Sequence, residues 1–442
     1  MNCMKAICTA AASSRFPRVG ILEKLFDIVY FTSLKTEEGR PIVARLCLVN
    51  PEKPDDSPPP RPRLSRWVTV QLANRLPLTV PNLVKIAKAA DPWSSAVAVY
   101  YDRAGALFIW GLIDQTVHWN RMLVREGSGY APPGIINVVA TGIADISVYR
   151  RWGFIGRLRQ DDLIRNQNDV FWSGPVAERL REWMRPFLNR IRRQVGAGLY
   201  DSQIWDGMFR ELWIGTLCRT LISIQRYRHG GAILIARSDN DLFPHYQIAY
   251  DRLPRHLLRI AIERAGKSEK SDQIIELIDD SDQQFVPIQD YLDERIGEAE
   301  IQDLEDSLTG AVHFISSLSC IDGLVLMRPD LSVRGYGVEI RTRKELDVIR
   351  LSYSPTLRVK TSRIVETINY GTRHRSMMRY CFSHPSSLGF VISQDGDIRA
   401  VMRVGEELVM WDNLKVHLLW SEDWDKAIQK VKRTAGKTAD SK

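Results

Sequence analysis

The sequence has few of the features that place a chain in a well-marked class of protein. No stretch of about 18 uncharged apolar residues, the length that spans a bilayer, occurs in its 442 residues, so we expect no contact with a membrane. The six cysteines include no CxxC pair and the eight histidines do not cluster, which argues against a disulfide framework and common zinc sites. The metalloprotease pattern HExxH and the hydrolase pattern GxSxG are absent. The first residues are too weakly apolar for a secretory signal, so the sequence predicts a cytoplasmic protein.

What the chain does contain is enough apolar material for ordinary globular cores. Hydrophobic residues make up 44% of the sequence, which excludes wholesale disorder, and the length favours two or three domains. The formal net charge of +8 suits a partner rich in phosphate, although solvated surface lysines and arginines explain it equally well. No pattern predicts a helix-turn-helix with a basic recognition helix, so we expect no nucleic-acid partner.

Shifts in composition divide the chain into successive segments. They are a disordered leader at 1–15, an N-terminal α+β domain at 16–252 with a proline-rich loop at 51–64, a charged helical connector at 253–297, a C-terminal domain at 298–420 and a basic tail at 421–442. Prolines keep the loop from packing, and the connector is charged and poor in aromatic residues.

Hydrophobic periodicity predicts the elements of the N-terminal domain. Apolar residues at near-helical spacing predict helices at 21–35, 175–195 and 202–228. Two apolar runs, at 95–101 and 106–113, enclose an Asp-Arg-Ala-Gly turn and predict a β-hairpin.

The C-terminal domain reads as helix, hairpin, helix, hairpin. A helical face at 304–318 precedes predicted strands at 321–327 and 331–340, and we expect a second helix at 362–370 before strands at 387–393 and 398–404. This order predicts the α/β class, with a sheet flanked by helices.

The segment Gly371-Thr372-Arg373-His374-Arg375 is the most informative in the chain. Arginine presents a fixed fork of donors that fits phosphate oxygens, and glycine lets the backbone approach closely. Thr372 adds a hydroxyl donor. A solvated basic turn before a helix would show the same residues, so the segment alone does not decide between binding and structure.

Asp322-Gly323-Leu324 opens a predicted buried strand upstream of that segment. A carboxylate at this point could hold Mg²⁺ or Mn²⁺ while phosphate oxygens complete the coordination shell, or it could orient a ribose hydroxyl. An ordinary Asp-Gly turn or a helix cap would look the same in the sequence.

Together these two segments resemble the DGA and RHR motifs of diadenylate cyclase domains, and the resemblance covers about residues 300–412. It implies a mixed sheet flanked by helices and a reaction that converts two ATP molecules into cyclic di-AMP and pyrophosphate. It also implies a homodimer in which two domains face each other, with Mg²⁺ or Mn²⁺ as cofactor. The residues N-terminal to this region resemble the DACNV-type sensor module that precedes such domains, with an unknown ligand.

The resemblance also assigns roles to residues. It implies four catalytic residues, Asp322, Arg373, His374 and Arg375. It implies nucleotide or phosphate contacts by Gly323, Leu324, Gly371, Thr372 and Ser393, and metal ligands at Asp322 and Asp395.

The chain departs from the family pattern where Leu324 replaces alanine and Gln394 replaces an acidic residue. These departures keep a second hypothesis open, a catalytically degenerate domain that senses a nucleotide in a signalling or defence system.

Overall fold

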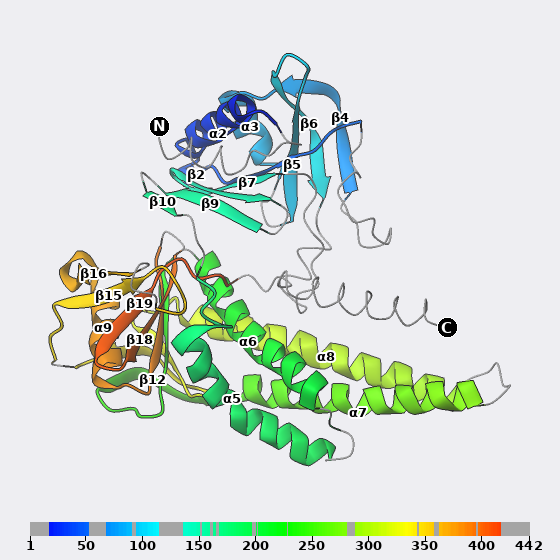
Figure 1. Cartoon of the computed structure of the whole chain (residues 1–442), viewed down its shortest axis with the longest axis vertical. Coiled ribbons are helices and arrows are strands. Elements are labelled where there is room, and N and C mark those ends of the chain that lie inside the picture. The colour runs from blue at the N-terminus through cyan, green and yellow to red at the C-terminus, as the bar shows by residue number, and fades with distance from the viewer. Residues whose placement is uncertain are drawn as a thin grey trace, which may run out of the picture. The chain divides into compact units, whose positions relative to one another are not determined.

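The chain divides into two compact units (Figure 1). The first unit comprises Met1–Gln167 and Leu418–Lys442, and the second unit comprises Asn168–His417. The computed structural model describes residues 17–52, 68–90, 94–114, 136–150, 153–159, 162–164, 168–196, 200, 202–227, 229–280, 288–342, 344–357, 362–394 and 397–416. The leader, most of the proline-rich loop and the basic tail lie outside these residues.

The first unit is built on an eight-stranded mixed sheet in the order β10-β9-β8-β7-β3-β5-β6-β4. Its strands are β3 (Ala44–Leu48), β4 (Val68–Pro77), β5 (Ser95–Tyr101), β6 (Leu107–Asp114), β7 (Asn137–Gly142), β8 (Asp145–Arg150), β9 (Gly153–Arg159) and β10 (Asp162–Ile164). A separate ribbon pairs β1 (Thr36–Glu37) with β2 (Arg40–Pro41). The predicted hairpin is confirmed as β5 and β6, which pair antiparallel.

Helices α2 (Val19–Ser33) and α3 (Val80–Ala87) cover one face of this sheet. The apolar side of α2, with Leu22, Leu25 and Phe26, is fully buried against alternate residues of the strands. This burial explains why the helix forms where the apolar periodicity predicts it. On β8 and β9, Asp145 and Arg157 form a partly buried ion pair with both N–O distances at 2.6 Å.

The second unit is built on a nine-stranded mixed sheet in the order β12-β14-β13-β11-β17-β18-β19-β15-β16. Its strands are β11 (Gly231–Ile235), β12 (Leu242–Tyr250), β13 (Leu324–Met327), β14 (Val333–Ile340), β15 (Val348–Ser352), β16 (Ser362–Glu366), β17 (Leu388–Ile392), β18 (Ile398–Val404) and β19 (Glu407–Trp411). Parallel pairs β11–β13 and β15–β19 lie among antiparallel pairs in this sheet, as β3–β5 does in the first sheet, so both large sheets confirm a mixed α/β fold.

Helices flank this second sheet. The face that carries Ala232 and Leu234 packs against Met377 and Met378 of α9 (Thr372–Ser383). The opposite face meets long helices, because a Cβ added to Gly231 would contact side chains near the ends of α6 and α8. The long helices are α5 (Gly174–Val195), α6 (Ser202–Arg226), α7 (Arg252–Asp280) and α8 (Ile288–Leu318).

Two predictions about this region are wrong. The domain boundary expected at 252 falls inside the second unit, because β11 pairs with β13 and β17 and β12 pairs with β14. The predicted helix at 362–370 is the edge strand β16 followed by a single 3-10 turn, Thr367–Asn369. The expected connector at 253–297 falls largely on α7 and the start of α8, which pack together.

Within the described part of the chain, no helix is both long enough and apolar enough to cross a bilayer.

Candidate functional site

Several strands of the second unit begin or end on the same side of its sheet, so their termini lie next to one another. Gly231 lies opposite Ile392 in the antiparallel pair β11–β17, and Ile233 lies opposite Val325 in the parallel pair β11–β13. Strands β11 and β13 therefore begin where β17 ends. The registers of β17 with β18 and of β18 with β19 add the start of β18 and the end of β19. We call this row of strand termini the site edge. The residues that directly precede or follow the strands there are Gly230, Asp322, Gly323, Ser393, Asp397 and Asp412.

The Gly-Thr-Arg-His-Arg segment forms the start of helix α9. Gly371 is the N-cap, and its carbonyl accepts a hydrogen bond from the backbone N–H of Arg375 at 3.1 Å. Gly371 and Thr372 are exposed, and the first turn contains no acidic residue. A helix N-terminus has free backbone N–H groups and a positive dipole end, so this turn favours an anion.

Arg373 brings this turn to the site edge. A Cβ added to Gly230, whose φ is +67°, would lie 2.9 Å from Nη1 of Arg373 and 3.2 Å from the backbone nitrogen of Gln394. Glycine adopts this positive φ without strain, and the end of the Arg373 side chain lies close to its backbone at the start of β11. The first turn of α9 thus lies beside the ends of β11 and β17.

Arg375 lies on the same turn, and its Nε atom is buried without a hydrogen-bond partner in the described part of the chain. An unsatisfied buried donor is costly, so Arg375 is a point of strain in the first turn of α9.

Ser393 closes the turn from β17 to β18. Its backbone N–H donates to the carbonyl of Asp397 at 2.9 Å, and its Oγ accepts from the backbone N–H of Asp397 at 3.1 Å. These bonds make Ser393 a structural part of the site edge. Asp395, the second predicted metal ligand, lies outside the described residues.

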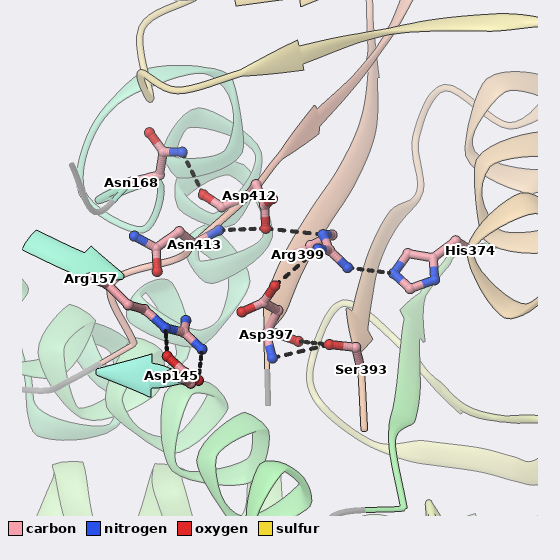
Figure 2. A network of polar contacts seen from close by, with 9 residues as sticks. All are labelled: Asp145, Arg157, Asn168, His374, Ser393, Asp397, Arg399, Asp412 and Asn413. Atoms are coloured by element: carbon pink, nitrogen blue, oxygen red, sulfur yellow. Dashed lines mark hydrogen bonds and ion pairs between the residues drawn. The ribbon is translucent and has the colours of Figure 1, made fainter. Parts of the chain in front are cut away.

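A network of charged side chains centres on Arg399 of β18 (Figure 2). Its Nη2 donates to Asp397 at 3.0 Å, its Nε donates to Asp412 at 3.0 Å, and its Nη1 lies 3.1 Å from Nε2 of His374. Asp397 is only 2% exposed, and the backbone N–H of Asn413 donates to Asp412 at 2.8 Å. The network therefore connects the start of α9 to the start of β18 and the end of β19.

This environment keeps His374 neutral. Burial lowers the pKa of His374 to about 4, and the positive charges of Arg399 and Arg373 act in the same direction. The nearby Asp412 carboxylate opposes the shift without cancelling it. At neutral pH the imidazole is therefore uncharged.

Asp322, Gly323 and Leu324 differ in their exposure and packing. The Asp322 side chain is exposed, and no hydrogen bond or ion pair within the described residues holds its carboxylate. Gly323 has φ at +112° and packs against the backbone of Gly337. Leu324 belongs to the core beneath α9 with 5% exposure, so the nucleotide contact predicted for it is open to its backbone but not to its side chain.

No group of three His, Cys, Asp or Glu side chains that could bind a metal occurs among the residues with a described placement. The residues present still fit Mg²⁺ or Mn²⁺ in a nucleotide complex. Mg²⁺ commonly takes one or two carboxylates, with substrate phosphates and water supplying the other ligands, and the free Asp322 carboxylate meets that need.

The sequence analysis missed Asp397, Arg399 and Asp412. Asp397 and Arg399 stand two residues apart at the start of a strand, so they share one face, and charged residues are rarely buried unless they are paired. This spacing in the sequence could have indicated an ion pair between Asp397 and Arg399. The contact of Arg399 with His374 could not be predicted in this way, because it depends on tertiary structure.

Comparison with known proteins supports the prediction for the N-terminal region. Residues 11–114 match the family model described as "Probable sensor domain DACNV", which confirms the predicted sensor domain over the span from α2 to β6. No curated protein matches the chain.

Proposed function

We propose that the second unit is a nucleotidyltransferase domain of the diadenylate cyclase type, regulated by the N-terminal sensor domain. It joins two ATP molecules into cyclic di-AMP and releases two pyrophosphates. The observation that supports this proposal is the shared position of the first turn of α9 at the site edge that also presents Asp322. The match to a sensor domain of a kind found with diadenylate cyclases supports it independently.

The first turn of α9 would bind the triphosphate. Arg373, the exposed Thr372 and the free N–H groups of the helix supply donors for phosphate oxygens. These donors also neutralise the charge that develops on the transferred phosphoryl group.

The reaction needs positioning more than a covalent intermediate. The 3′-oxygen of each ATP attacks the α-phosphorus of the other ATP and forms a new P–O bond with it. The bond from that phosphorus to pyrophosphate breaks, and the hydroxyl proton leaves. Two copies of the second unit in a face-to-face homodimer would bring the two nucleotides into line. Asp322 would hold Mg²⁺ or Mn²⁺, which supplies charge neutralisation at the phosphates.

The sensor domain would act on the encounter between two copies. A ligand that binds the sensor differently in the paired and unpaired states shifts that equilibrium by its difference in affinity. The oligomeric state of the active protein tests this point, because a monomer with full activity contradicts it.

The first experiment is mass spectrometry of the products after the full chain is incubated with ATP and Mg²⁺ or Mn²⁺. We expect cyclic di-AMP from the wild type, and none from Asp322→Asn. Asp303→Asn is the matched control, because Asp303 is an equally exposed carboxylate on α8 of the same unit. Equal product from Asp322→Asn and the wild type would refute the role of Asp322.

Gln394 supports a second candidate function, because it stands where the cyclase family has an acidic residue. A domain with this change could bind a nucleotide as a signal without turning it over. Calorimetry separates the two functions, since saturable ATP binding without pyrophosphate release supports the sensor and rules out the cyclase. The absence of both binding and product would exclude both.

A further inference from the structure

The contact between Arg399 and His374 fixes which nitrogen of the imidazole carries the proton. A guanidinium has only donors and keeps its proton in proteins, so Nη1 of Arg399 must donate across the 3.1 Å to Nε2 of His374. Nε2 is therefore the bare nitrogen. A proton on Nε2 would point at a positively charged donor, which excludes both the other neutral tautomer and the imidazolium in this arrangement.

The rest of the network holds Arg399 in this orientation. Asp397 and Asp412 each accept one hydrogen bond from the guanidinium, so all three of its nitrogens are engaged. The two carboxylates come from the start of β18 and the end of β19, next to the regular antiparallel pairing of these two strands. The guanidinium therefore has little freedom to turn away from the imidazole.

We propose that Arg399 is a positioning residue that holds His374 as the neutral Nδ1–H tautomer and so makes it a fixed hydrogen-bond donor at the start of α9. The tautomer follows from the geometry of this unit alone. Its use as a donor to the phosphate of a bound nucleotide rests on the proposed function.

The groups that face His374 support this assignment. They are Arg399 from β18, Asp412 from the end of β19, Arg373 from the same helix turn and the ring of Tyr370 just before α9. Nδ1 points away from Arg399 (Figure 2), and it has no hydrogen-bond partner within the part of the chain that the structure describes. The donor is therefore available to a ligand.

This assignment has a consequence for chemistry at the site. The single free lone pair of the neutral imidazole, on Nε2, is already engaged by Arg399. His374 therefore has no acceptor with which to take the proton from an attacking ribose hydroxyl. It contributes to binding and orientation, and another group or water accepts the proton.

The test is nitrogen NMR of the full chain labelled with ¹⁵N-histidine. In a neutral imidazole the protonated and the bare nitrogen resonate far apart, and the His374→Gln variant assigns the signal. We expect Nδ1 protonated and Nε2 bare between pH 5.5 and 8. A proton on Nε2, or a titration of His374 near the ordinary value of 6.5, would overturn the proposal.

Two variants test the role of Arg399. Arg399→Met should give a mixture of tautomers and raise the pKa of His374, since a positive charge is lost while Asp397 and Asp412 remain. Arg403→Met is the matched control, because Arg403 lies on the same strand with its own polar partners and does not bond His374. An unchanged tautomer in Arg399→Met, or an equal change in Arg403→Met, would contradict the proposal. Arg399→Lys keeps the charge and should retain part of the wild-type tautomer preference.

Adding ATP separates the donor role from the proposed function. If calorimetry shows binding and the Nδ1–H signal shifts, His374 contacts the nucleotide. If ATP binds and the signal does not move, the donor role is wrong while the cyclase proposal stands. If no ATP binds, the donor role falls with the proposed function, and the spectrum without nucleotide still decides the role of Arg399.

Discussion

The replacement of Gly323 by alanine tests whether this glycine serves packing or ligand binding. Gly323 has φ at +112°, and a Cβ there would lie 2.5 Å from the carbonyl carbon of Gly337 and 2.7 Å from the nitrogen of Val338. A non-glycine residue in such a backbone conformation costs about 1–3 kcal/mol. Overpacking against rigid backbone adds about 1–3 kcal/mol. We expect Gly323→Ala to lower the free energy of unfolding of the second unit by about 4 kcal/mol, the middle of the summed range.

Thermal unfolding followed by circular dichroism measures this effect. For a unit of this size, 1 kcal/mol shifts the midpoint by about 2–4 °C, so the expected fall is about 8–16 °C. Gly310→Ala is the control. Gly310 lies inside α8 with nothing within 4 Å of an added Cβ, and alanine favours a helix by about 1 kcal/mol. The same chemical change should therefore destabilise at one position and stabilise slightly at the other.

An unchanged or higher midpoint for Gly323→Ala would refute this reasoning, because the close approach of β13 to β14 would then tolerate a side chain. A large fall would assign Gly323 to packing. Loss of nucleotide binding in that variant would then report unfolding and would not locate a ligand.

Three further predictions concern charged groups. Asp397→Asn should destabilise the second unit by about 1.5–3 kcal/mol in urea unfolding, because it removes the charge of one of the two carboxylates that pair with the largely buried Arg399 guanidinium. Glu407→Gln, in a more exposed ion pair, should cost at most about 1 kcal/mol. Folding lowers the pKa of His374 from 6.5 to about 4, so between these pH values the unfolded chain binds a proton that the folded chain does not. The free energy of unfolding of the wild type should therefore fall between pH 6.5 and pH 4 by more than that of His374→Gln. Asp145→Asn should increase hydrogen exchange in β8 and β9, since it breaks the partly buried ion pair with Arg157, and unchanged exchange would contradict this.

The sequence predicted the elements with strong periodicity. The strands at 95–101 and 398–404 occur with the predicted bounds, because each is a continuous β-forming run between turn residues. Strand β12 was missed because Pro244 and its polar neighbours obscure the pattern, although an edge strand accepts both. Ser362–Glu366 forms a strand because it pairs with β15, a contact that local sequence does not encode.

The sequence indicated segments of the candidate site but not the contacts that connect them. The sequence singled out the first turn of α9 and the start of β13, and the sheet places both at the site edge. It did not indicate that His374 is neutral, because the pKa depends on burial and on Arg399 from a different strand. It also gave Leu324 an exposed role, although the apolar run that follows Gly323 continues into the core.

The position of β11 determines how this protein can be divided. This strand lies between β13 and β17 in the middle of the sheet, yet in sequence it precedes helices α7 and α8. A recombinant fragment that starts at residue 253 contains every predicted motif but leaves β13 and β17 with open edges where β11 belongs. Open edges of apolar strands pair with other chains, so such a fragment would aggregate, whereas one that starts at Asn168 keeps the sheet whole.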